Sequence, residues 1–266
     1  MELPSFTSLD LELDAGWLTV WFNQPEIRNA LTNERAADLT ALCAALEDRR
    51  DIRGVTFRGR GGTFCAGGDL KAFKDVFQGG AKREEVIALS ASAGALFDAV
   101  NALPQVTVMA VEGAAMAGGF GLACCGDVVI AEAGAKFSFS ETKIGLTPAQ
   151  ISPFVLQRLG ARIGRKLMLT AATLDGAGAA AVGLADEVVE GSEAMDEAIA
   201  RIAAQVRKSA PGAVANTKRL ILAMPRLDRS AQIDAAADSF ADAMLSDEGR
   251  EGVMSFAQKR KPSWAE

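Results

Sequence analysis

The chain has 266 residues, a net charge of −6 at neutral pH, and apolar side chains at 49% of its positions. These values predict a soluble globular protein with one large core and argue against nucleic acid as its main partner. Histidine and tyrosine are absent. Histidine-dependent nucleophilic catalysis and histidine-based metal sites are therefore excluded, so acid–base chemistry must come from carboxylates, lysine, cysteine, backbone groups or water.

No apolar run reaches the length of a membrane span, and no secretory signal is visible at the first residues. The cysteines Cys43, Cys65, Cys124 and Cys125 have no metal-binding spacing, and the last two fall in an apolar segment. We expect reduced, buried thiols in a cytoplasmic protein, with no metal site and no membrane partner.

The predicted elements begin with a β-hairpin over Leu9–Leu13 and Trp17–Phe22. Asn23–Ala30 is predicted as a loop, and Thr32 as the N-cap of a helix that continues to about Arg49. Further strands and helices then follow. The predicted strands are Gly54–Phe57, Val106–Val111, Val128–Ala131 and Lys136–Phe139, and the predicted helices are Glu84–Ala102, Pro148–Leu159 and Ile163–Ala171.

A helix, a turn and a strand are predicted within Thr173–Val189. From Met195 onward the spacing of apolar residues is almost entirely helical. The four helices expected there are Met195–Arg207, Ala213–Ala223, Ser230–Leu245 and Gly249–Arg260. The order of elements indicates parallel βαβ units with a helical C-terminal region. Because that region is thin, we expect its apolar stripes to pack on a neighbouring subunit.

Two glycine-rich turns each follow a predicted strand, one in Phe64–Leu70 and one in Ala117–Gly119. Each turn can bring a backbone N–H to the same carbonyl oxygen, and two such donors stabilise an enolate formed next to a thioester. Neither turn matches a nucleotide-phosphate motif. From the residues alone, glycines that serve only close packing are an equal alternative.

Glu141 follows a short predicted strand and lies between two apolar runs. A carboxylate in this place is either partly desolvated or salt-bridged. Desolvation raises the pKa toward the range useful for a general acid or base. The residues alone slightly favour the other interpretation, a structural glutamate paired with Lys143.

Several motifs in order resemble the enoyl-CoA hydratase/isomerase (crotonase) family over nearly the whole chain. They are Asn23–Leu31, Thr63–Leu70, Val111–Ala131, Lys136–Pro148 and Glu251–Pro262. The resemblance implies an α/β fold with a crotonase-like ββα spiral core at residues 1–190. It also implies a helical region at 191–266 for oligomerisation and CoA contact, and assembly as a homotrimer or a dimer of trimers.

The resemblance further implies an acyl-CoA thioester substrate, with no separate cofactor because CoA is part of that substrate. The motifs assign the two carbonyl-binding N–H groups to Ala66 and Gly118, and the acid–base role to Glu141. The implied substrate and CoA contacts are Arg28, Ala30, Ala66, Asp69, Leu70, Phe256 and Lys259, the last two from the same or a neighbouring subunit.

One position departs from the family pattern. Typical hydratases of the family place two glutamates around one water. The second matches Glu141, but the first falls at Gly121, which has no side chain. The usual two-glutamate hydration is therefore in doubt.

Three functions remain open. One is a hydratase in which Glu141 works alone, helped by a group on the substrate. Ser140–Gly160 resembles a branch of hydratases whose substrates, 3-methylglutaconyl-CoA and isohexenylglutaconyl-CoA, are 3-branched and carry a second carboxylate. Another is an enoyl-CoA isomerase, because a double-bond shift needs one base. The last is an acyl-CoA-binding protein without catalysis.

Overall fold

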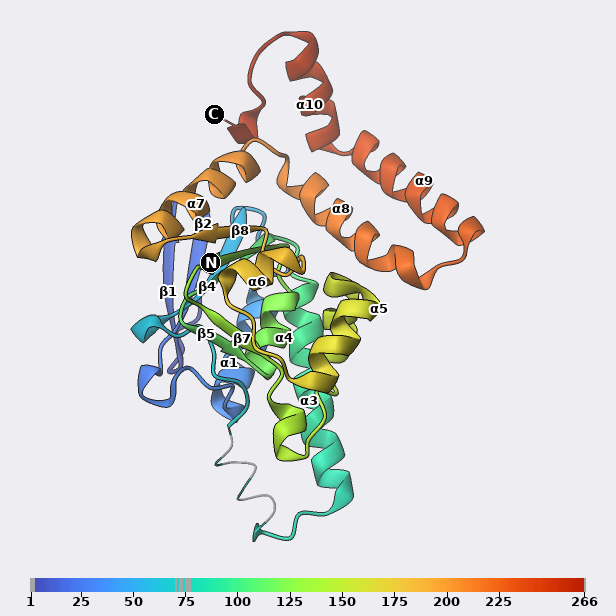
Figure 1. Ribbon diagram of the computed structural model, residues 1–266. Helices are drawn as coiled ribbons and strands as arrows, with labels where there is room; N and C mark the ends of the chain where they lie inside the picture. Colours follow the sequence, from blue (N-terminus) through green and yellow to red (C-terminus); the bar gives the residue numbers. More distant parts are fainter. Residues whose placement is uncertain (1–2, 70, 72–73, 75–77, 266) are drawn as a thin grey trace.

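The computed structural model describes residues 3–69, 71, 74 and 78–265, and Figure 1 shows its elements. Among these residues, six strands form the main sheet. Their order across the sheet is β1 (Leu9–Asp14), β2 (Trp17–Phe22), β3 (Gly54–Gly59), β4 (Val106–Val111), β6 (Val128–Glu132) and β8 (Glu187–Val189). β1 and β2 form the predicted antiparallel hairpin, and the other neighbours pair in parallel.

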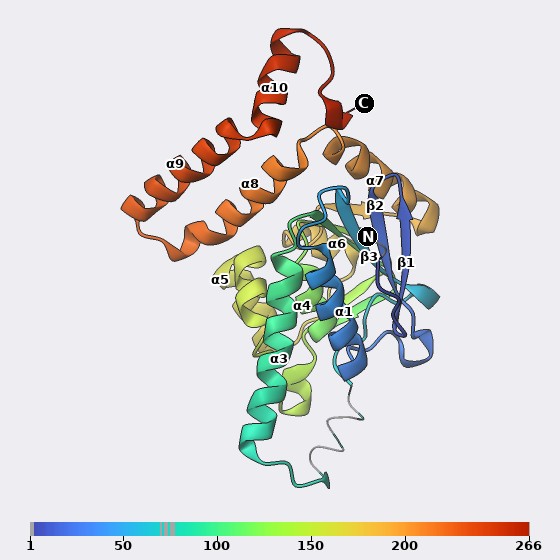
Figure 2. The same ribbon diagram turned by 180° about the vertical axis from the view of Figure 1, so that it is seen from behind.

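The central strands β3 and β4 are buried on both faces, whereas most of β1 is exposed or half-buried. Successive side chains of a strand point to opposite sides, so each central strand contributes to two cores. On β4, Met109 and Val111 belong to the larger apolar core, whereas Val108 and Ala110 belong to a second, smaller one. The larger core is closed by α1 (Asn33–Leu46), α3 (Arg83–Asn101), α4 (Gly118–Cys124) and α5 (Ser152–Thr170), of which the first three lie side by side in Figure 2.

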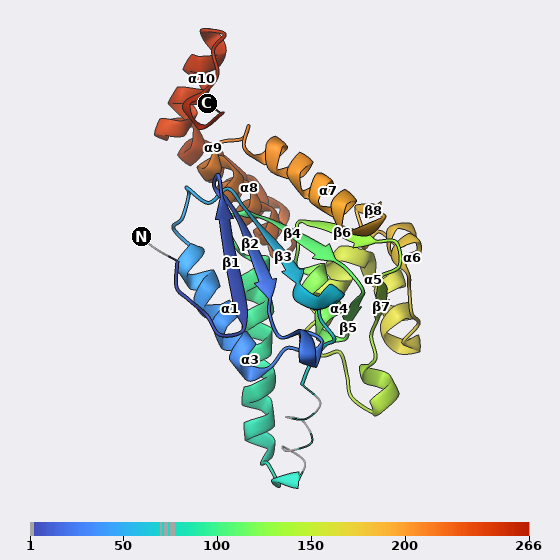
Figure 3. The same cartoon turned by 90° about the vertical axis from the view of Figure 1, so that its left-hand side faces the viewer.

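The smaller core is closed by α7 (Gly191–Val206), which buries Met195, Ala198 and Ala203 against the sheet. This helix begins just after the predicted division at residue 190, and the division itself stays a prediction. Figure 3 shows β1, β2 and β3 side by side.

Two predicted helices, α1 and α3, are present, and each has one feature that bears on its prediction. α1 begins as predicted, since the Thr32 hydroxyl accepts a hydrogen bond from the Arg35 N–H at 3.1 Å. α3 has buried residues only in its C-terminal half, at Leu96, Phe97 and Val100. Val86, in the first turn, is 44% exposed because this end of α3 extends beyond the sheet.

A second layer lies beyond the ends of the main strands. It contains β5 (Ala114–Met116) and β7 (Lys136–Ser138), which pair in parallel. No strand was predicted at β5, because two alanines and a methionine carry little intrinsic strand preference. The break between β4 and β5 occurs at Gly113, whose φ is +62°. A Cβ there would lie 2.0 Å from the Gly62 carbonyl oxygen, so only glycine fits.

The other α-helices in the described part of the chain are α6 (Gly176–Ala181) and three in the C-terminal region. These three, α8 (Pro211–Ala223), α9 (Arg229–Leu245) and α10 (Asp247–Ala257), extend away from the sheet (Figures 1 and 2). α9 buries none of its residues, and Phe240 is 70% exposed. No helix in the described ranges is long and apolar enough to cross a membrane.

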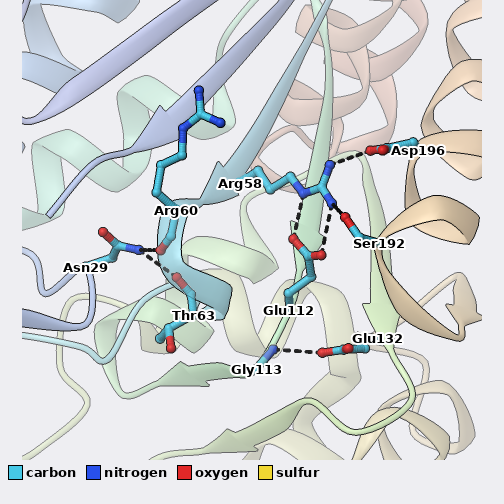
Figure 4. Close-up of polar contacts among 9 residues, drawn as sticks. All are labelled: Asn29, Arg58, Arg60, Thr63, Glu112, Gly113, Glu132, Ser192 and Asp196. Carbon is cyan, nitrogen blue, oxygen red and sulfur yellow. Dashed lines mark hydrogen bonds and ion pairs between the residues drawn. The ribbon is translucent and has the colours of Figure 1, made fainter. Parts of the chain in front are cut away.

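A buried arginine joins α7 to the ends of β3 and β4 (Figure 4). Arg58 is 5% exposed and holds both carboxylate oxygens of Glu112, at 2.6 and 2.9 Å. The same guanidinium contacts Asp196 at 2.5 Å and the Ser192 hydroxyl at 2.6 Å, both on α7. The Glu112 carbonyl accepts the Phe64 N–H, so this cluster supports the first glycine-rich turn.

Arg58→Ala is expected to lower the free energy of unfolding by about 3 kcal/mol, because it leaves the largely buried Glu112 carboxylate without its partner. Asp196→Asn is the matched control: Asp196 is 64% exposed, and the loss should stay below about 1 kcal/mol. Urea unfolding of both variants measures the difference. Equal losses would show that Arg58 and Glu112 do not form the main connection.

Candidate functional site

Three chain segments bring the predicted site residues to one edge of the second layer. Cys65 pairs in parallel with Ala115, and Ala115 pairs in parallel with Phe137. The residues that follow these positions therefore leave the layer at the same edge. They include Gly68, Gly118 and Glu141, so the two glycine turns and the candidate acid–base residue lie at one edge.

The second turn presents the N–H of Gly118. Ala117 has φ +48° and ψ −118°, which reverses the chain between β5 and α4. No described residue accepts a hydrogen bond from the Gly118 N–H. A Cβ at Gly118 would lie 3.1 Å from Leu31 Cδ1 and 3.8 Å from Phe97 Cζ, so apolar side chains border this N–H. This environment suits an acceptor oxygen on an otherwise apolar ligand.

In the first turn, the structure does not leave the Ala66 N–H open, contrary to expectation. This N–H donates to the Arg28 carbonyl at 3.0 Å. The next residue, Gly67, has φ +97°, which turns the backbone, and within the described chain nothing accepts a hydrogen bond from the Gly68 N–H. Gly68 was therefore missed, although the adjacent glycine pair in the sequence was a signal for it.

The two turns also touch each other directly. A Cβ at Gly67 would lie 2.8 Å from the Met116 carbonyl oxygen, and one at Gly119 would lie 2.4 Å from the Cys65 carbonyl oxygen. The glycines of the described turns therefore fall into two kinds. Gly67 and Gly119 serve close packing, whereas Gly68 and Gly118 leave N–H groups without a partner.

Glu141 begins a short 3-10 helix at Glu141–Ile144. Its Oε2 atom is buried without a hydrogen-bond partner, and no ion pair with Lys143 or another described cation forms. Burial raises the pKa of this carboxyl above its usual value. These observations favour the acid–base interpretation over the paired structural glutamate.

Ile151 occupies the place of any side chain at Gly121. A Cβ on Gly121 would lie 2.1 Å from Ile151 Cγ2, and Ile151 is 3% exposed. This isoleucine immediately precedes α5, whereas Gly121 lies within the buried α4. The missing first glutamate is therefore replaced by packed hydrocarbon.

Cysteine does not offer an alternative reactive group in the first turn. Cys65 is fully buried, and this burial raises the pKa of its thiol to about 11. It therefore stays protonated at neutral pH and is a weak nucleophile.

The predicted CoA contacts fall into two groups. The Arg28 side chain is exposed, and Ala30 and Asp69 are half-buried, all near the first turn; Leu70 lies outside the described residues. Phe256 and Lys259 lie in the tail, whose end is held by a hydrogen bond of 3.1 Å from Arg53 to the Trp264 carbonyl. Arg53 precedes β3, at the opposite end of the sheet, so the chain does not bring its own tail to its own site.

A cavity of about 550 Å³ lies away from these turns, between α8 and the ends of α3, α4 and α5. It adjoins Cys124 and Cys125 at the C-terminal end of α4, whereas Gly118 begins that helix. Its buried Lys218 is bound to Asp127 at 2.7 Å and to the Gln105 carbonyl at 3.2 Å. This cavity is separate from the candidate site.

Glu141→Gln is expected to stabilise the protein at neutral pH, because it removes a partly buried charge whose Oε2 atom has no hydrogen-bond partner among the described residues. Burial raises the pKa of Glu141 in the folded state, so ionising this carboxyl destabilises the fold. The destabilisation is absent below the unfolded pKa, grows as the pH rises from the unfolded to the folded pKa, and is constant above it. Melting temperatures of the wild type and the variant should therefore converge in acid and separate toward neutral pH. A variant that is less stable at every pH would indicate a partner for the carboxylate.

Comparison with known proteins agrees with this geometry. The family model of enoyl-CoA hydratase/isomerase matches residues 12–266. Pseudomonas aeruginosa AtuE is 42% identical in sequence, with a TM-score of 0.94 over 98% of this chain and 100% of that one. An enoyl-CoA hydratase/isomerase from Marinobacter aquaeolei is 36% identical, with a TM-score of 0.92 over 97% of this chain and 99% of that one.

A curated human relative, the mitochondrial enoyl-CoA hydratase domain-containing protein 2, is 30% identical over 259 residues. The match covers 94% of this chain and 86% of the relative. The fold, the converging turns and these matches agree, and the chain belongs to the enoyl-CoA hydratase/isomerase family.

Proposed function

We propose that this protein adds water to a 2-enoyl-CoA thioester that is branched at carbon 3 and carries a distal carboxylate, of the 3-methylglutaconyl- or isohexenylglutaconyl-CoA type. The observation that carries this proposal is that Ile151 fills the space where a side chain at Gly121 would lie. It leaves Glu141 as the one carboxylate assigned to the water, so a second charged group must come from the substrate.

The mechanism uses the backbone and one side chain. The Gly68 and Gly118 N–H groups donate to the thioester oxygen and stabilise the enolate that forms during addition. Glu141 takes a proton from water as the water oxygen bonds to the β-carbon, and the π electrons move onto the thioester. The same carboxyl then returns a proton to the α-carbon. We assign the first donor to Gly68 in place of Ala66, whose N–H is bound to Arg28.

A raised pKa suits the two roles of Glu141. A carboxylate with a higher pKa is a stronger base toward water, and its acid form protonates a carbanion while remaining partly ionised near neutral pH. The distal carboxylate of the substrate would orient the water or the acyl chain, which the first family glutamate does elsewhere. CoA is part of the substrate, and the proposal requires no further cofactor.

The CoA end of the site is proposed to be completed by a second subunit. Phe256 is 88% exposed, and α9 and α10 expose further apolar side chains that a neighbouring chain would bury. Because the tail lies far from its own site, Phe256 and Lys259 would contact CoA held by another subunit. This arrangement supports a homotrimer or a dimer of trimers.

An enoyl-CoA isomerase is the second candidate, and the same observation favours it. A double-bond shift moves one proton between two carbons, which a single carboxylate accomplishes without a second group on the water. A 3-enoyl-CoA ester distinguishes the two activities, because only the isomerase converts it to the 2-enoyl ester without a change in mass.

Turnover is expected to be much faster with 3-methylglutaconyl-CoA or isohexenylglutaconyl-CoA than with crotonyl-CoA, which lacks the distal carboxylate. Values of kcat/KM for the three esters, measured by chromatography of the products, give the comparison. Glu141→Gln serves as the blank, since it should bind the esters without converting them. Equal values for crotonyl-CoA and 3-methylglutaconyl-CoA would contradict the proposed substrate class.

Gly121→Glu alone is expected to destabilise the protein, because its Cβ meets Ile151. Adding Ile151→Gly, which also removes the Ile151 Cβ that would lie 2.4 Å from the new Cβ, should restore part of the lost stability, and the double variant should hydrate crotonyl-CoA faster than the wild type does. Thermal melts and crotonyl-CoA assays of both single variants and the double variant test this. Additive losses of stability would show that Ile151 does not occupy the place of the first carboxylate.

A further inference from the structure

The segment Gln24–Ala30 forms a strap beside the first glycine turn. Arg28 and Asn29 have φ values of +51° and +54°, a left-handed conformation that asparagine tolerates better than most residues. The Asn29 N–H closes the strap by donating to the Gln24 carbonyl at 3.0 Å. Asn29 is fully buried although its side chain is polar.

The Asn29 amide connects three parts of the backbone. Its Oδ1 accepts the Gln24 N–H at 3.0 Å within the strap. Its Nδ2 donates to the Arg60 carbonyl at 2.9 Å and to the Thr63 carbonyl at 2.7 Å, as Figure 4 shows. Thr63 directly precedes the first glycine turn, so this amide holds the strap and the start of the turn together.

The guanidinium of Arg35 binds both ends of the strap, Gln24 and Ala30. Arg35 is fully buried, and it donates to the Ala30 carbonyl at 2.7 Å and to the Gln24 side-chain oxygen at 3.0 Å. The strap is therefore fixed at both ends by buried polar groups, and a buried polar group that loses its partners is costly.

Two backbone hydrogen bonds pass from this part of the chain to the turn itself. The Arg28 carbonyl accepts the Ala66 N–H at 3.0 Å, and the Leu31 N–H donates to the Gly67 carbonyl at 2.7 Å. The Gly67 carbonyl and the Gly68 N–H belong to one planar trans peptide, so they point in opposite directions. The bond from Leu31 therefore directs the Gly68 N–H away from the strap.

We propose that Asn29 is a positioning residue that sets the orientation of the Gly68 N–H through the strap. This inference rests on the proposed function, in which that N–H donates to the thioester oxygen. Asn29 does not touch the substrate. It acts by fixing the Arg28–Leu31 backbone relative to Thr63, and thereby the Gly67–Gly68 peptide.

Asn29→Asp and Asn29→Gly test this role in the full-length protein. Aspartate keeps the acceptor for the Gln24 N–H but turns an oxygen toward the Arg60 and Thr63 carbonyls, which repels them. Glycine adopts the positive φ without strain and removes the amide entirely. Asn216→Asp on α8 is the matched control, since its Oδ1 accepts a hydrogen bond from Arg219 that aspartate also accepts.

Two measurements separate positioning from stability. In the first, kcat for 3-methylglutaconyl-CoA hydration, measured well below each melting temperature, should fall about 100-fold in both Asn29 variants while KM changes less than about threefold. In the second, bound 4-dimethylaminocinnamoyl-CoA should show a smaller red shift of its absorption than in the wild type, because its carbonyl is less polarised. Asn216→Asp should match the wild type in both.

The outcomes are distinct. Wild-type kcat and red shift in Asn29→Gly, with only a lower melting temperature, would overturn the proposal and leave Asn29 a purely structural residue. If Asn29→Asp does not fold, Asn29→Gly decides the question alone. If the wild type shows the red shift but hydrates no ester, the proposed hydration fails, and the red shift of the variants still tests the positioning role.

Discussion

The site depends on direct backbone contact between its two glycine turns. Gly67 and Gly119 each face a carbonyl oxygen of the other turn, so closely that a Cβ at either position would require the turns to separate. This contact continues the parallel pairing of Cys65, Ala115 and Phe137. The backbone pairing therefore brings the residues that follow these three positions, Gly68, Gly118 and Glu141, to the same edge of the layer.

The same layer explains the unusual surroundings of Glu141, the candidate acid–base residue. Phe139 stacks on Phe120 with ring centroids 4.0 Å apart, which fixes the end of β7 against α4 just before Glu141. Burial of the Glu141 carboxyl raises its pKa, and its Oε2 atom has no hydrogen-bond partner in the described chain. Ile151 extends this apolar packing over Gly121. The fold thus buries part of one carboxylate, at Glu141. At Gly121, where the family pattern has another glutamate, there is no carboxylate.

Much of the fold could be predicted because its signals are local and periodic. The hairpin, the parallel strands and the C-terminal helices follow from residue alternation and helical spacing. β5 was missed because Ala114–Met116 is a strand only through its neighbours. The exposed first turn of α3 was missed because apolar periodicity does not reveal where the sheet ends. The exposed tail matches the prediction that the C-terminal region is too thin to bury its own stripes.

For the candidate site, both turns and Glu141 could be located from the sequence, but the free N–H of the first turn was expected at Ala66, where the structure has a hydrogen bond to Arg28. Whether Ala66 or Gly68 presents its N–H depends on the φ of Gly67 and on the Arg28 carbonyl, which is distant in sequence. Similarly, the absence of a side chain at Gly121 was visible, but its cause was not. Ile151 lies 30 positions later, and only the packing of α5 on α4 brings it there.

The central claim is that hydration uses one protein carboxylate, Glu141, together with two backbone N–H donors and a carboxylate on the substrate. Turnover of 3-methylglutaconyl-CoA in water enriched in ¹⁸O, followed by mass spectrometry of the CoA ester, tests it most directly. The account predicts a product heavier by one water that carries ¹⁸O, formed by the wild type and not by Glu141→Gln. Labelled product formed equally by Glu141→Gln, or an isomer without label, would contradict it.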